Sequence, residues 1–103
     1  MKTKVVFRKF NDGGDIIAIF PRVPGTSSGY DCMSYQHNGQ HGVADPAIVS
    51  ITTLATPNEC VSLRWELKAL GYDLDIRTKM TYKDQLHRMA EIKQQRTDNR
   101  VTA

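Results

Sequence analysis

The chain has 103 residues, of which 40% are hydrophobic and 24% charged, and a formal net charge of +3, values typical of one globular domain with a modest core. No apolar run approaches the ~18 residues that a membrane-spanning helix needs, and Arg8, Lys9 and Asp12 interrupt the N-terminal apolar stretch too early for a signal peptide. We therefore expect a cytoplasmic protein that has no membrane contact and whose two cysteines stay reduced.

Two paired strands are predicted near the N-terminus. Residues 5–10 mix β-branched, aromatic and basic side chains, and the next four residues, Asn-Asp-Gly-Gly, have the composition of a tight hairpin turn. Residues 15–20 are apolar at successive positions, which is typical of a central strand covered on both faces. Residues 21–30 are rich in proline, glycine and serine and therefore predict a surface loop.

Less regular strands are expected in the middle of the chain. Residues 32–37 alternate and predict a third strand, which the Asn-Gly step at positions 38 and 39 ends, and residues 40–45 have the composition of a turn. Residues 48–54 are rich in β-branched side chains and favour a fourth strand, with a short helix as the alternative. Asp45 before Pro46 suits the start of one helical turn.

The clearest local signal predicts a helix over residues 57–70. Thr56 and Glu59 are placed to form a capping box, Pro57 takes the first helical position, and Gly71 supplies a left-handed stop.

This helix has two apolar stripes at helical spacing. The stripe expected to pack on the sheet consists of Cys60, Leu63, Leu67 and Leu70. The stripe expected to contact a second helix consists of Val61, Trp65 and Ala69. If the second helix is detached, the latter stripe becomes a partner surface or the interface of a homo-oligomer.

A last strand is predicted over residues 72–77, followed by a second helix over residues 82–95 that Thr81 begins, with Asp84 at its third position. The apolar stripe expected to face inward on this helix consists of Tyr82, Leu86, Met89 and Ala90, with Ile92 at its edge.

These elements predict an α+β fold: a mostly antiparallel sheet of four to five strands with one helix packed across it and a second, basic C-terminal helix. We expect a core domain over residues 1–79, the basic amphipathic helix over residues 80–96 and a frayed tail over residues 97–103.

Residues 34–42 are the densest set of side chains that bind, donate or exchange protons. His37 and His41 have the spacing of metal ligands on a helix, but two glycines disfavour a helix here and a zinc site needs three or four ligands. We therefore expect no metal and no other cofactor. A small enzyme or metal-binding protein that uses this turn, with Asp45 or Cys32 in support, is the alternative hypothesis.

The charge is distributed unevenly, because residues 77–103 carry seven Lys and Arg against three acids, whereas the two kinds balance over residues 1–63. This asymmetry suits contact with nucleic acid or with an acidic protein surface, and it is also common on a solvated helix. Since no complete catalytic set is recognisable, we expect a binding module for a nucleic acid or nucleoprotein. The predicted binding residues are Tyr35, Gln36, His37, Gln40, His41, Lys83, Arg88, Lys93 and Arg96.

Four segments together resemble a known family: Phe7–Phe10, Asp15–Pro21, Tyr35–Gly42 and Ala55–Pro57. The family consists of small proteins of unknown function encoded by bacteriophages and mobile elements, largely of gut bacteria. The resemblance spans about residues 5–77 and assigns no role to any residue. Small phage proteins often act by binding a host or phage machine, so the resemblance implies a host protein or nucleoprotein as partner, including inhibition of a host nuclease such as a CRISPR effector.

Overall fold

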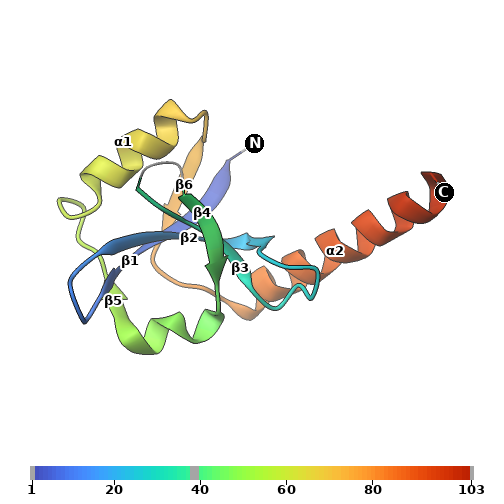
Figure 1. Ribbon diagram of the computed structural model, residues 1–103, viewed down its shortest axis with the longest axis horizontal. Helices are drawn as coiled ribbons and strands as arrows, with labels where there is room; N and C mark the ends of the chain where they lie inside the picture. Colours follow the sequence, from blue (N-terminus) through green and yellow to red (C-terminus); the bar gives the residue numbers. More distant parts are fainter. Residues whose placement is uncertain (1, 38–39, 103) are drawn as a thin grey trace.

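The computed structural model describes residues 2–37 and 40–102, and for residue 40 and residues 96–102 it describes the backbone alone. The strands are β1 (Thr3–Phe10), β2 (Ile16–Pro24), β3 (Cys32–Gln36), β4 (Gln40–Ala44), β5 (Thr52–Leu54) and β6 (Leu74–Arg77). The helices are the 3₁₀ helix η1 (Pro46–Ile51), α1 (Val61–Ala69) and α2 (Tyr82–Thr102). α1 lies against the sheet, whereas α2 extends away from the body of the molecule (Figure 1).

Over the described residues the sheet has the strand order β4-β3-β2-β1-β5, and β6 pairs with β1 as well. β5 runs antiparallel to the C-terminal half of β1, while β6 runs parallel to its N-terminal half, so the two share one edge of the same strand. All other pairings are antiparallel. The predicted α+β fold, with one helix packed on a mostly antiparallel sheet and a second helix at the C-terminus, is confirmed.

The predicted N-terminal hairpin is present, with Phe7 opposite Ala18. Its turn contains Gly13 and Gly14, whose φ angles of 87° and 76° lie in the region that favours glycine. Successive residues of β2 lie in two separate hydrophobic cores, because adjacent side chains of a strand point to opposite faces. This confirms that β2 is covered on both faces.

One core lies between the sheet and α1, and the other lies between the sheet and the segments around η1 and the start of α2. The first core is formed by Val5, Phe7, Ala18, Phe20, Tyr35, Cys60, Leu63 and Leu67. The second core is formed by Ile17, Ile19, Cys32 and Ala44, with Phe10, Ile48 and Met80 packed against it.

The capping box before α1 is confirmed, since Glu59 Oε1 accepts from Thr56 N at 2.9 Å and Thr56 Oγ1 accepts from Glu59 N at 3.3 Å. The regular helix nevertheless begins at Val61, because residues 57–60 form turns. Leu63 and Leu67 are buried as predicted, whereas Leu70, the last member of the predicted stripe, is 53% exposed.

The prediction that Trp65 contacts the second helix is wrong, because Trp65 is 67% exposed and α2 leaves the sheet in another direction (Figure 1). Ala69 is also exposed and Val61 is half-buried. α1 therefore does not need a second helix as a packing neighbour, because it packs on the sheet. A homo-oligomer through these three residues stays a prediction.

Two predictions for the middle of the chain need correction. The expected turn at residues 40–45 is the strand β4, which pairs with β3 and places Ser34 opposite Gly42. The expected strand at residues 48–54 is divided between η1 and the short β5. Asp45 caps η1 as predicted, since its Oδ1 accepts from Ala47 N at 2.8 Å. The predicted strand end at Asn38 and Gly39 lies outside the described residues.

The largest correction concerns the face that α2 turns inward. The residues predicted to form its buried stripe are exposed: Tyr82, Leu86, Met89 and Ala90. Among residues 82–95 of α2, whose side chains the structure describes, the buried ones are Asp84, Arg88 and Ile92, which recur every fourth position and pack beside β2 and the loop after it. The backbone of α2 is helical as far as Thr102, and the frayed tail over residues 97–103 stays a prediction. No helix in the described part of the chain combines the length and apolar character needed to cross a membrane.

Candidate functional site

α2 is joined to the sheet through an acidic side chain that is completely buried. Asp84 accepts hydrogen bonds from Lys4 Nζ at 2.7 Å, Arg22 Nε at 2.9 Å and the amide of Thr81 at 2.8 Å. Burial raises the pKa of Asp84, but the hydrogen bonds from Lys4, Thr81 and Arg22 outweigh it and hold the pKa below its usual value. The carboxylate therefore stays ionised and keeps both cations in place.

Arg88, one turn further along α2, is 3% exposed. Its guanidinium donates to three backbone carbonyl oxygens: Pro21 at 2.6 Å, Gly29 at 3.0 Å and Tyr30 at 3.0 Å. These carbonyls belong to the end of β2 and to the loop that follows it. Arg88 was predicted as a binding residue, but the structure places it inside, where it secures this loop to α2.

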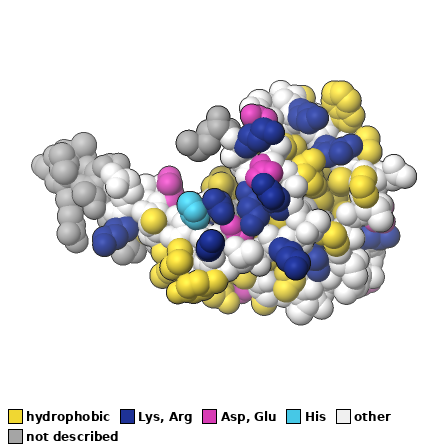
Figure 2. All heavy atoms as spheres, turned by 180° about the vertical axis from the view of Figure 1, so that it is seen from behind, with side chains coloured by type: hydrophobic (Ala, Val, Ile, Leu, Met, Phe, Trp, Pro, Cys, Tyr) yellow, Lys and Arg dark blue, Asp and Glu magenta, His cyan; other side chains and the backbone are white. Residues whose placement is uncertain are grey.

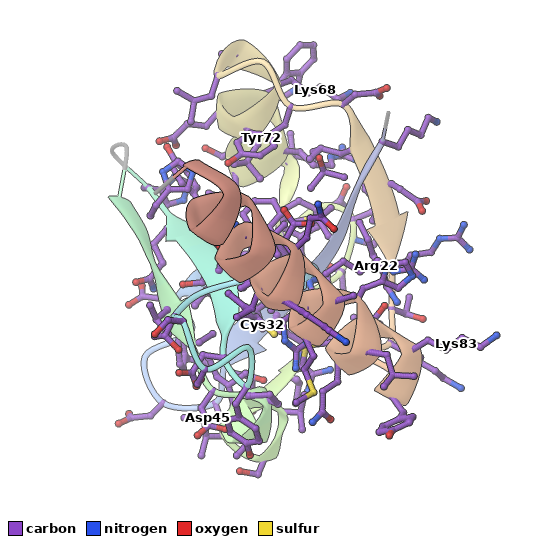
Figure 3. All side chains as sticks on the ribbon, turned by 90° about the vertical axis from the view of Figure 1, so that its right-hand side faces the viewer. Arg22, Cys32, Asp45, Lys68, Tyr72 and Lys83 are labelled. Atoms are coloured by element: carbon purple, nitrogen blue, oxygen red, sulfur yellow. The ribbon has the colours of Figure 1, made fainter. Side chains whose placement is uncertain are left out.

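A groove of about 710 Å³ opens where the N-terminal half of α2 meets β1, β2 and β6. We call it the basic groove, after the side chains that line it: Lys2, Lys4, Arg22, Arg77, Lys83 and His87. Lys and Arg side chains gather on this face, near the point where α2 leaves the body of the molecule (Figure 2). Arg22 and Lys83 extend to the same side of α2 (Figure 3).

The acids around the basic groove neutralise only part of its charge. Asp75 and Glu91 also line it, and Asp75 Oδ1 accepts from Arg77 Nε at 2.9 Å. Lys2 and Lys83 are exposed, and no acidic partner for either is found among the described residues. The groove therefore presents unneutralised ammonium groups beside cations that are already held in position. Such an arrangement suits a phosphate or another anion with several charged oxygens.

A second group of polar side chains, the tyrosine–histidine cluster, connects β3, β4 and the residue after β3 with α1 and the segment that follows α1. Its members are Tyr35, His37, His41, Glu66 and Tyr72. The Oη of Tyr35 donates to Glu66 Oε1, and His37 Nδ1 lies 2.8 Å from Glu66 Oε2. His41 Nε2 lies 2.8 Å from the Oη of Tyr72, whose ring stacks on Phe20 at 5.1 Å.

The cluster brings together the predicted residues Tyr35, His37 and His41, although Tyr35 is buried and both histidines are exposed. Sequence reasoning missed Glu66 and Tyr72, which come from α1 and the segment after it. Each imidazole is hydrogen-bonded to a side chain that belongs to or follows α1, so the cluster fastens α1 to β3 and β4. Within the described residues there is no group of three or more His, Cys, Asp or Glu that could hold a metal ion.

The other predicted binding residues are distributed differently. Gln36 is half-buried on β3, and the side chains of Gln40 and Arg96 lie outside the described residues. Lys93 is exposed on α2, whereas Lys83 lines the basic groove. Sequence reasoning did not include four of the groove's basic side chains, which come from outside α2. Lys2, Lys4 and Arg22 lie far from α2 in the chain, and Arg77 ends β6.

No family model, curated protein or solved structure matches the chain. The resemblance to proteins of bacteriophages and mobile elements therefore stays a prediction.

Proposed function

We propose that this protein is a binding module that engages the phosphate backbone of a nucleic acid through the basic groove. The observation that supports the proposal most is the convergence of Lys2, Arg77 and Lys83, from three separate segments, on one groove. Phosphate contacts supply most of the affinity of nucleic-acid-binding proteins, and lysine and arginine make these contacts.

The buried carboxylate of Asp84 supports this proposal because it organises the groove before any ligand arrives. It holds Lys4, whose side chain is 13% exposed, and Arg22, whose side chain is 44% exposed. A cation that is already fixed loses less conformational entropy on binding than one on a free side chain. Arg22 keeps enough exposure to contact a phosphate while Asp84 orients it.

A nucleoprotein could bind in the same groove, because its nucleic acid supplies the phosphates. The role implied by the resemblance, engagement of a host nuclease complex, is compatible with this mode of binding. The nucleic acid is the part of such a complex that the basic groove is suited to contact.

Fluorescence anisotropy with labelled single-stranded DNA, single-stranded RNA and duplex DNA tests the proposal at about 50 mM salt, where phosphate contacts are strong. Lys83→Glu is expected to weaken binding by about tenfold or more, because it removes one phosphate contact and adds repulsion. Lys68→Glu is the matched control, since it makes the same charge change on α1, far from Lys83 (Figure 3).

Equal losses in the two variants would show that net charge, and not the basic groove, governs binding. Failure to bind all three probes at this salt concentration would remove the proposal.

A further inference from the structure

A second hollow, of about 570 Å³, adjoins the basic groove, and Thr81 lines both. We call it the aromatic hollow, after Tyr30 and Tyr82, which line it with Met80 and Val49. Tyr30 is 51% exposed and Tyr82 is 70% exposed. The two tyrosine rings are therefore open to a ligand, next to a groove that is lined with cations.

The first turn of α2 connects the two sites. Tyr82 lines the aromatic hollow and Lys83, the next residue, lines the basic groove. Successive side chains of a helix point about 100° apart, so these two side chains project to different sides of the same helical turn. A ligand that crosses the start of α2 can place an anionic group at Lys83 and a planar group at Tyr82.

We infer that the nucleic acid bound here is single-stranded, with its phosphates in the basic groove and its bases stacked on Tyr82 and Tyr30. This inference rests on the proposed function. A single strand carries phosphates and unpaired bases side by side, which matches the neighbouring cationic and aromatic sites. Every base has a π face, so stacking on tyrosine gives affinity without requiring a particular sequence.

A duplex fits this pair of sites less well. Its bases are paired and stacked inside the helix, so it can satisfy the basic groove but leaves both tyrosine rings without a partner. The remaining lining of the aromatic hollow also suits unpaired bases, because Met80 and Val49 offer apolar contacts and Lys79 adds a cation. The hollow is within the size range of typical small-ligand pockets.

The test compares one oligonucleotide in single-stranded form with the duplex of the same sequence. Wild-type protein is expected to bind the single strand at least about tenfold more tightly. Tyr82→Ala is expected to weaken single-strand binding by about tenfold, the loss of one stacked base, while Tyr82→Phe keeps the ring and stays within about twofold. Neither variant is expected to change duplex binding.

A fluorescence readout separates stacking from a general structural effect. In a Trp65→Phe background, Tyr82→Trp makes residue 82 the single indole of the chain. Single-stranded oligonucleotide is expected to quench its emission, and duplex is expected to leave it unchanged.

Equal affinity for the two forms, or no loss in Tyr82→Ala, overturns this inference and leaves the proposed function standing. In that case the aromatic hollow belongs to a protein partner or to no ligand. Failure of every nucleic acid to bind removes the inference and the proposed function together.

Discussion

Replacing Arg88 with methionine tests whether this arginine is structural. Its guanidinium donates to Pro21, Gly29 and Tyr30, and methionine fills a similar volume without any donor. Arg88→Met is therefore expected to leave the three carbonyl oxygens without a partner, to loosen the loop after β2 and to weaken the attachment of α2.

The expected loss follows from the burial of the three carbonyl groups. A hydrogen bond from a charged donor contributes about 1.5–3 kcal/mol, and leaving a buried acceptor unpaired costs a similar amount. Pro21 and Gly29 are buried, whereas Tyr30 is exposed, so water can replace only part of the hydrogen bonding that Arg88 provides. Arg88→Met should therefore lower the free energy of unfolding by about 3–5 kcal/mol, a large share of the about 5–15 kcal/mol typical of a domain.

Urea denaturation followed by circular dichroism measures this change. Arg88→Lys keeps the charge but cannot reach three carbonyls with one ammonium group, so an intermediate loss of about 2–3 kcal/mol is expected. Lys83→Met, an exposed change on the same helix, should stay within about 0.5 kcal/mol. A loss below about 1 kcal/mol for Arg88→Met would refute the structural role.

Two further predictions concern Asp84 and the buried thiols. Because the pKa of Asp84 in the folded protein is held below the ordinary value for an aspartate, the ionised carboxylate stabilises the fold above that ordinary value, and this stabilisation is lost as the pH falls through the folded-state pKa. The difference in free energy of unfolding between wild type and Asp84→Asn should therefore be largest at neutral pH and shrink in acid, and a difference independent of pH would contradict the ion pairs. Burial raises the pKa of the Cys32 thiol, and Cys60 is buried as well, so an aromatic disulfide reagent should label both thiols only after urea unfolds the protein. Rapid labelling of the native protein would show that these cysteines are accessible.

Elements encoded by neighbouring residues could be predicted from the sequence. The hairpin at Gly13 and Gly14 depends on positive φ angles within one turn, and the capping box of Thr56 and Glu59 closes within four residues. The first helix buries Leu63 because its apolar positions repeat with the helical period. In each case the physical cause lies within one or two turns of the chain.

The inward face of α2 could not be predicted because its cause lies far away in the sequence. Hydrophobic periodicity placed Leu86 and Met89 inside, but the segment beside α2 presents the carbonyls of Pro21, Gly29 and Tyr30, which need donors. Arg88 supplies these donors from 58 to 67 residues away. From the sequence alone, an Asp and an Arg four positions apart on a helix predict an ordinary exposed ion pair, and only the contacts with the sheet show that both are buried.

β4 was missed for a similar reason. Gly42 has the appearance of a turn residue, but in the sheet a Cβ at this position would lie 3.3 Å from Ser34 Oγ, so glycine allows close contact between the strands. The basic groove was only partly predicted, through Lys83, because Lys2, Arg22 and Arg77 reach it from the chain start, β2 and β6. Charge counted along the sequence does not show which cations converge in space.

The salt dependence of binding to a single-stranded oligonucleotide tests the basic groove most directly. A plot of log affinity against log salt concentration should be linear, with a slope of about −0.7 for each neutralised phosphate. Replacing both Lys2 and Lys83 with alanine should reduce the magnitude of that slope by about 1.4, while Lys68→Ala leaves it unchanged. A slope that is the same in the wild type and the double variant would contradict the central claim that these lysines bind phosphate.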